Sequence, residues 1–267
     1  MWKWEAVGQP KAVAVIFHNA YEHHAWYAWL IEKLRSEGFK VVMGDLPGHG
    51  SLNTNLKYHD EDFSSYYTYA AKLLEVASLE NLPVFVIANG LGGNIAIRTI
   101  YKNKYDIAGL VLVSPWLHLK HAPGKMSKTM ASLSAITSSM KLKHDITLND
   151  FTRNLEAQLE MQDENPFKPV VSVKWFTELN NLNKLLKDYI EIKLPNIPVL
   201  LMTGKEDRII DAQAAIQWLF GQKFSNFQYK EWKHAKHSLF FELERDEVFY
   251  VTRDFMYNNL RSIGYII

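Results

Sequence analysis

The chain has 267 residues, of which 48% are hydrophobic, and this is enough for one large buried core. Its formal net charge of +1 excludes a general electrostatic attraction to nucleic acid or to an anionic membrane. The sequence contains no cysteine, which excludes disulfides, thiolate metal sites and a cysteine nucleophile.

Short apolar runs alternate with helical patterns along the chain, and this alternation predicts a mostly parallel sheet covered by helices on both faces. Residues 2–6 are expected to form an antiparallel edge strand. One helix is expected at residues 25–36, because its large apolar residues recur on one side. The remaining strands are expected at residues 13–17, 39–44, 84–88, 109–114, 199–203 and 227–232.

A glycine-rich turn, Ala88-Asn89-Gly90-Leu91-Gly92-Gly93, lies between an expected strand and an expected helix. This is the setting of the nucleophile elbow, G-x-S-x-G, in which a serine is presented at the top of a parallel sheet. Gly90 stands in the serine position and offers no nucleophile. A dinucleotide-binding turn is disfavoured, because the spacing is not G-x-G-x-x-G and no acidic residue ends a second strand about 20 positions later. Taken by itself, the turn is equally compatible with a plain packing role.

Residues 118–195 hold no confident strand, and this stretch is too long for an ordinary connection. Amphipathic segments are expected within it at residues 126–140, 148–161 and 172–186. Met126, Met130 and Met140 are candidates for the lining of an adaptable apolar channel. The alternative is an ordinary helical lid in which the Met and Leu side chains only pack against the rest of the protein.

Near the C-terminus, Asp207 follows an expected strand, and His237 comes 30 residues later, before a helical run. The order of nucleophile position, acid and histidine is that of α/β-hydrolases and differs from the orders found in proteases of other folds.

Five motifs in register resemble the α/β-hydrolases related to monoacylglycerol lipases and bacterial lysophospholipases, the serine aminopeptidase-like group. The resemblance covers essentially the whole chain and predicts the α/β-hydrolase fold. The motifs are His18-Asn19-Ala20-Tyr21-Glu22-His23 (H-G-x-x-E-H in the family), Asp45-Leu46-Pro47-Gly48-His49-Gly50, Ala88 to Gly93 (G-H-S-x-G-G), Gly204-Lys205-Glu206-Asp207, and His237-Ser238-Leu239-Phe240-Phe241-Glu242.

The resemblance also implies a role for each matching position. Asp207 corresponds to the triad acid and His237 to the base, and the N–H groups of Ala20 and Leu91 would form the oxyanion hole. Gly90 is the vacant nucleophile position. Residues 1–117 and 196–267 would form the hydrolase core, and residues 118–195 would form the helical cap (lid) over the active site.

Departures from the family pattern cluster where the chemistry would happen. Gly90 replaces Ser, Asn89 replaces His, Ala88 replaces the first Gly, and Asn19 replaces the Gly beside the oxyanion donor. The elbow serine occupies a strained backbone region that costs about 1–3 kcal/mol for a non-glycine residue. Glycine relieves that strain, so the fold should survive the loss. Gly90→Ser alone is expected to restore some reactivity towards fluorophosphonates.

Other polar residues near these motifs have simpler interpretations. His18 is expected to hydrogen-bond to the backbone. His23 and His24 with Glu22 suggest a metal site, but adjacent histidines point apart and no third ligand is evident, so no metal is expected. Substitute nucleophiles were considered at Ser51 and Ser114, neither of which is expected in an elbow turn. Structural or solvated roles are expected for Asp45, Glu206 and Asp211.

Three functional hypotheses follow. The first is a pseudoenzyme that binds an acyl lipid or regulates a partner. The second is an ester hydrolase with residual activity, in which His237 and Asp207 activate water. The third is an active serine hydrolase whose serine was replaced by design. We expect a cytoplasmic protein with no cofactor, no nucleic-acid partner and no transmembrane segment, since no apolar run reaches roughly 18 residues. The expected partner is a small acyl lipid or ester, and transient contact with a membrane surface stays open.

Overall fold

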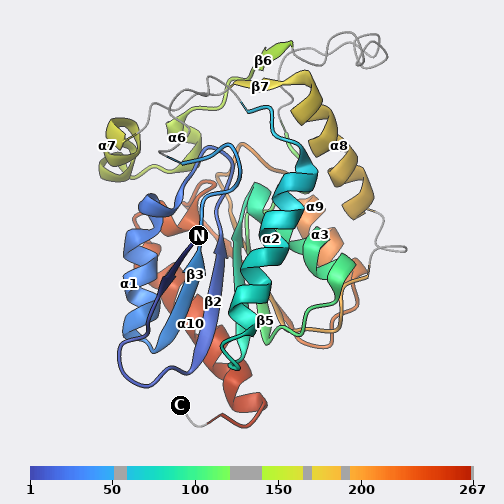
Figure 1. Cartoon of the computed structure of the whole chain (residues 1–267). Helices are drawn as coiled ribbons and strands as arrows, with labels where there is room; N and C mark the ends of the chain where they lie inside the picture. Colours follow the sequence, from blue (N-terminus) through green and yellow to red (C-terminus); the bar gives the residue numbers. More distant parts are fainter. Residues whose placement is uncertain (51–58, 121–139, 165–169, 188–192, 266–267) are drawn as a thin grey trace.

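A seven-stranded sheet runs through the centre of the molecule (Figure 1). The computed structural model describes residues 1–50, 59–120, 140–164, 170–187 and 193–265. The strand order is β1-β3-β2-β4-β5-β8-β9; β1 pairs with β3 antiparallel, and the other neighbours are parallel. The parallel sheet and its antiparallel edge strand are therefore confirmed. The strands are β1 (Trp2–Trp4), β2 (Ala12–Phe17), β3 (Phe39–Met43), β4 (Val84–Asn89), β5 (Gly109–Val113), β8 (Val199–Gly204) and β9 (Phe227–Trp232).

Helices cover both faces of the sheet, because its central strands are apolar on both sides (Figure 1). In β2, Val13 and Val15 belong to the same apolar cluster as residues of α2, α3 and α9, whereas Ala14 and Ile16 belong to the cluster that includes residues of α1 and α10. The expected helix at residues 25–36 begins as a 3-10 turn, His24–Tyr27, and continues as α1. The helices of the two layers are α1 (Ala28–Ser36), α2 (Phe63–Ser78), α3 (Leu91–Asn103), α9 (Ala212–Gly221) and α10 (Arg245–Ser262).

The polar motifs gather at one edge of the sheet. Parallel strands end on the same side, and the register pairs Phe17 of β2 with Ala88 of β4, and Asn89 with Val113 of β5. The loops after β2, β4, β5 and β8 therefore open at this carboxyl edge, where open α/β sheets bind their ligands. No helix in the described part of the chain is both long and apolar enough to cross a membrane.

The insertion between β5 and β8 contains a small antiparallel sheet as well as helices. The expectation of no strand here was wrong, because β6 and β7 have only three residues each, too few for a clear sequence pattern. The expected helix at residues 148–161 is interrupted near Thr152, and the segment 126–139 lies outside the described residues. The elements are β6 (Lys141–Lys143), α6 (Leu148–Phe151), α7 (Leu155–Glu164), β7 (Val170–Ser172) and α8 (Val173–Lys187).

The helix α8 packs on α2 and α3 and not only on the rest of the insertion. Its buried side chains, among them Trp175 and Leu179, belong to the same apolar cluster as α2 and α3. The Trp175 indole N–H also donates to the Tyr66 hydroxyl of α2 at 2.9 Å. The division into a core of residues 1–117 and 196–267 and a cap of residues 118–195 stays a prediction.

A matched pair of leucine substitutions tests how firmly α8 is packed. Leu179 is fully buried, whereas Leu185 on the same helix is 38% exposed. Leu179→Ala should cost about 2–5 kcal/mol of unfolding free energy through lost burial and a cavity. Leu185→Ala should change it by about 0.5 kcal/mol or less. Urea unfolding of both variants checks this, and equal small losses would mean that α8 does not share the core.

Candidate active site

Gly90 occupies a sharp turn between the end of β4 and the start of α3. Its backbone angles are φ 49° and ψ −118°. The Gly90 N–H donates to Val113 O of the neighbouring strand at 2.9 Å, which holds the turn against the sheet. The positive φ favours glycine over any residue with a side chain. The strand–turn–helix geometry expected of the elbow is thus present, with glycine at its apex.

The side chain of Asn19, from the loop after β2, reaches into this turn. Its carbonyl oxygen Oδ1 accepts hydrogen bonds from the N–H groups of Ala20, at 2.8 Å, and Leu91, at 2.9 Å. These are the two N–H groups that the family resemblance assigns to the oxyanion hole. Both are therefore bonded to a carbonyl group that belongs to the protein itself.

The Asn19 amide also fills the space beside Gly90. A side-chain carbon added to Gly90 would lie 1.9 Å from Asn19 Oδ1 and 2.2 Å from Asn19 Cγ. Real Cβ atoms essentially never approach another atom within 3.0 Å. The expectation that Gly90→Ser alone restores reactivity is therefore revised, because Asn19 must also move or be replaced.

Asp207 and His237 lie close together and are buried. Asp207 follows β8, and its Oδ1 accepts from the backbone N–H groups of Ile209, at 2.8 Å, and Ile210, at 3.1 Å. Its other oxygen, Oδ2, lies 2.7 Å from His237 Nδ1. The side chains of both residues are 1% exposed. This is the arrangement of an acid that orients a histidine ring.

The second nitrogen of His237 is also occupied. The indole N–H of Trp116, a buried residue in the loop after β5, donates to His237 Nε2 at 2.9 Å. Because the indole can only donate, His237 Nε2 is the acceptor of this hydrogen bond. The ring proton is therefore on Nδ1, which donates a hydrogen bond to Asp207. Nothing in the local sequence marks the direction of the Trp116 side chain, so this contact could not be predicted.

Glu22 connects the Asn19 loop with the His237 loop. Its Oε2 accepts from the Asn19 backbone N–H at 2.9 Å and from the Tyr27 hydroxyl, and its Oε1 accepts from Ser238 Oγ at 3.1 Å. Burial raises the pKa of the Glu22 carboxyl. The H-G-x-x-E-H motif marks Glu22 itself, but its contacts with Tyr27 and Ser238 have no signature in the local sequence.

His18 bonds to the backbone as expected, with Nδ1 2.7 Å from Asn19 O, while Nε2 accepts from Leu46 N–H at 2.8 Å. His24 bonds to Asp45 instead of converging with His23, and the described residues contain no group of three or more potential metal ligands.

Of the two serines considered as substitutes, Ser114 is described and Ser51 is not. Ser114 is fully buried with φ 44°, and its hydroxyl has no partner among the described residues. It follows a strand but is succeeded by a loop, so it is not in an elbow turn.

An apolar cleft lies beside the turn, under the insertion. It has a volume of about 10 Å³, roughly the space of one water molecule. Trp116 joins the cleft to the turn, since its backbone N–H donates to Gly90 O at 3.3 Å. The lining residues are Tyr21, Trp116, Leu119, His144, Ile146, Val171, Trp175, Phe176 and Leu179.

Of the three methionines proposed for a channel, only Met140 is described, and the structure gives it no part in this cleft. Its side chain is 46% exposed next to β6. Met126 and Met130 lie outside the described residues. The aromatic residues of α8 and of the loop after β5, not Met140, line the described apolar space.

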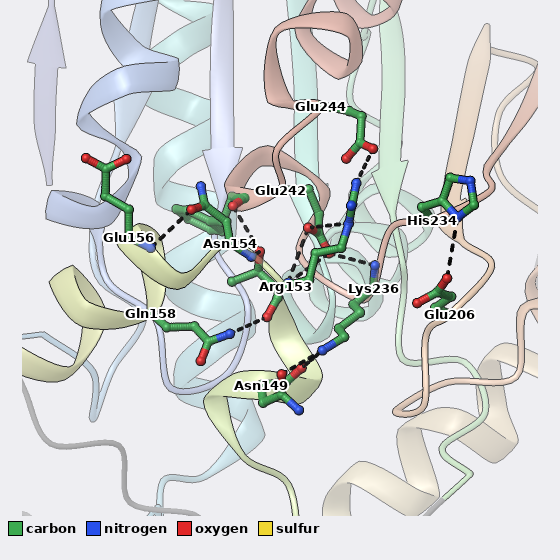
Figure 2. Close-up of polar contacts among 12 residues, drawn as sticks. Asn149, Arg153, Asn154, Glu156, Gln158, Glu206, His234, Lys236, Glu242 and Glu244 are labelled. Atoms are coloured by element: carbon green, nitrogen blue, oxygen red, sulfur yellow. Dashed lines mark hydrogen bonds and ion pairs between the residues drawn. The ribbon is translucent and has the colours of Figure 1, made fainter.

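Polar contacts tie the insertion to the loop that carries His237 (Figure 2). The backbone N–H of Arg153, after α6, donates to both carboxylate oxygens of the buried Glu242 at 3.3 Å. Lys236 Nζ donates to Asn149 Oδ1 at 2.7 Å, as Figure 2 shows. Because Lys236 precedes His237, α6 and the histidine loop are mechanically connected.

Comparisons with known proteins agree with the fold. The sequence profile described as serine aminopeptidase, S33, matches residues 8–244. Phospholipase YtpA of Bacillus subtilis (strain 168) is 34% identical over 262 residues, 96% of this chain and 98% of that protein. Monoglyceride lipase of Homo sapiens is 26% identical over 249 residues, 90% of this chain and 80% of that protein. The crystal structure of Paleococcus ferrophilus monoacylglycerol lipase matches with a TM-score of 0.77 and 24% identity over 97% of this chain and 98% of that chain. The predicted α/β-hydrolase fold is confirmed.

Buried imidazoles near the site make acid sensitivity testable. Burial lowers the pKa of His18 and of His144 to about 4, below the usual 6.5. Because the folded-state pKa is the lower one, the unfolded chain binds protons first as the pH falls. Stability should therefore decline from about pH 6.5 towards about pH 4, by up to about 1.4 kcal/mol per pH unit for each group.

His144→Gln should reduce this slope in urea unfolding between pH 7.5 and 4.5. His234→Gln provides the control, because that side chain is 60% exposed. Equal slopes for the wild type and His144→Gln would contradict the assignment of this pH dependence to the buried ring.

Proposed function

Because the chain belongs to the serine aminopeptidase S33 family, we propose that it binds single-chain acyl lipids of the monoacylglycerol or lysophospholipid type without serine hydrolysis. Phospholipase YtpA and monoglyceride lipase are the names of its relatives, which supports an acyl-lipid ligand. The apolar and aromatic lining of the cleft supports the same class of ligand. An acyl chain needs more room than about 10 Å³, so binding requires the cleft to widen.

The observation that carries this proposal is the place of the Asn19 amide. The amide occupies the space that a side chain at Gly90 would need. Its Oδ1 accepts hydrogen bonds from both N–H groups of the expected oxyanion hole. Removing a single oxyanion donor costs an acyl-transfer enzyme about 10²–10³ in turnover. Here both donors are engaged and no nucleophile stands at the turn, so ordinary serine catalysis lacks two of its components.

Residual hydrolysis by activated water is the less favoured function. A water molecule would have to displace the Trp116 indole from His237 Nε2, and the ester carbonyl would have to displace Asn19 Oδ1. In serine proteases, what remains after loss of the triad is roughly 10³–10⁴ over the reaction in water, and it depends on a free oxyanion hole.

A serine removed by design is also disfavoured, because Asn19 and Gly90 fit one another. A serine at position 90 beside Asn19 would place its Cβ 1.9 Å from Oδ1. A single replacement of serine by glycine would leave the asparagine unexplained. The paired departures favour a protein whose site changed at both positions.

Probe labelling tests the absence of serine catalysis. The wild type should not react with a fluorophosphonate, and Gly90→Ser alone should gain little because its side chain meets Asn19. Overpacking should also lower the stability of Gly90→Ser by about 1–3 kcal/mol. The double variant Asn19→Gly with Gly90→Ser should be labelled, because it removes the obstruction and supplies the hydroxyl.

Adding His237→Ala to the double variant is the control and should abolish labelling. Labelling of the wild type at any serine would show that the nucleophile lies elsewhere. A well-folded double variant that stays unlabelled would mean that the site lacks more than these two groups.

Thermal shift tests the ligand class. A monoacylglycerol at about 100 times its Kd should stabilise the protein by about 2.7 kcal/mol. For a chain of this size that corresponds to roughly 5–10 °C in Tm. ATP and GTP should have no effect, because the cleft lining has no charged side chain among the described residues. Stabilisation by nucleotides alone would reject an acyl-lipid site.

A further inference from the structure

The Asn19 amide nitrogen is a buried hydrogen-bond donor that has no partner in the described part of the chain. Asn19 is 1% exposed, and its Nδ2 makes no hydrogen bond among the described residues. Buried polar groups in folded proteins are nearly always satisfied, and an unpaired donor is costly. An unpaired donor at the turn of a hydrolase fold therefore points to a ligand atom that accepts from it.

The orientation of the amide is determined by its surroundings. The N–H groups of Ala20 and Leu91 both require an acceptor, so the oxygen faces them and the nitrogen faces away. The nitrogen lies 2.7 Å from the position of a side-chain carbon at Gly90. The carbonyl oxygen is closer to that position, at 1.9 Å, so the NH₂ group lies beside the place of a serine side chain, on the far side of the amide.

Two hydrogen bonds at the oxygen also strengthen the amide as a donor. Hydrogen bonds in a chain polarise one another, so electron density drawn to Oδ1 leaves the Nδ2 protons more positive. The backbone of Asn19 is held in turn by its N–H bond to Glu22 at 2.9 Å. The two backbone N–H groups thus do not bind a ligand directly, but they make the Asn19 NH₂ group a stronger donor.

We propose that the Asn19 NH₂ group binds the carbonyl oxygen of an intact acyl ester, in place of the backbone oxyanion hole. This inference rests on the proposed function and names the group of the ligand that is recognised. An uncharged carbonyl fits better than a fatty-acid carboxylate, because no lysine or arginine lies among the described residues that line the cleft. The buried carboxyl groups of Asp207 and Glu22 nearby disfavour a further anion.

Binding of three matched ligands tests the proposal. These are a 1-monoacylglycerol, the 1-alkylglycerol ether of equal chain length, which lacks the carbonyl, and the free fatty acid at pH 8. The wild type should bind the ester about tenfold more tightly than the ether, the effect of one hydrogen bond, and the fatty acid more weakly than the ester. The side-chain amide resonances of Asn19 should shift with the ester and not with the ether.

Asn19→Asp is the most informative variant. Its carboxylate has nearly the same size and still accepts from Ala20 and Leu91, but it has no proton to offer. Because Asp207 and Glu22 oppose a third negative charge, this variant is measured at pH 8 after circular dichroism has shown that it is folded, and it should then lose the preference for ester over ether. Asn103→Ala is the control, since that amide donates to Thr99 O of the same helix, α3, and the variant should keep the wild-type preference. Asn19→Ala, checked for folding, should bind ester and ether equally.

The possible results separate the two proposals. Wild-type binding of none of the three ligands, measured on folded protein, would reject the proposed function and this inference together. Equal wild-type affinity for ester and ether would leave acyl-lipid binding intact and overturn the role of Asn19. Tighter ester binding by Asn19→Ala would also overturn it, because Asn19 would then be a plug that blocks the two backbone N–H groups.

Discussion

The position of the Asn19 side-chain carbonyl is the constraint on which the rest of the site depends. Two backbone N–H groups from different loops, after β2 and after β4, converge on this one oxygen. The amide that satisfies them lies against the turn, so a side chain at residue 90 would force Asn19 to move. Asn19 and Gly90 are therefore structurally coupled, because the side chain present at one position determines the space available at the other.

In this arrangement the groups that would act in catalysis are hydrogen-bonded to the protein itself. In a working hydrolase the oxyanion donors wait for a charge that develops only in the transition state, and functional sites commonly carry strain or unmet bonding for that reason. Here the donors have an acceptor, the turn carries a glycine, and His237 Nε2 receives the Trp116 indole. The polar groups that define the fold's chemistry are bonded to one another, and this favours stability over turnover.

The sequence was sufficient for the parts of the structure that depend on periodicity and strand ends. The apolar runs predicted seven strands of the central sheet to within two residues at each boundary, and Asp207 and His237 were paired through the order of motifs. The contacts of Asn19 and Trp116 could not be predicted, because they depend on side-chain directions in loops that carry no periodic signal. The strands β6 and β7 were missed since three residues cannot establish an alternation. Glu22 was visible in a motif, but its contacts with Tyr27 and Ser238 are long-range and have no local signature.

The Asn19 nitrogen, which has no partner among the described residues, is the feature of this site that indicates a ligand. A small apolar side chain at position 19 would leave the N–H groups of Ala20 and Leu91 without the acceptor that Asn19 provides. An asparagine instead satisfies the two backbone N–H groups and places two protons on the far side of the same amide. The site thus retains one polar contact to offer, and Trp116 connects the turn with an apolar cleft that α8 helps to line. A donor next to apolar walls is the composition of a site that orients a ligand by a single oxygen and holds the remainder by burial.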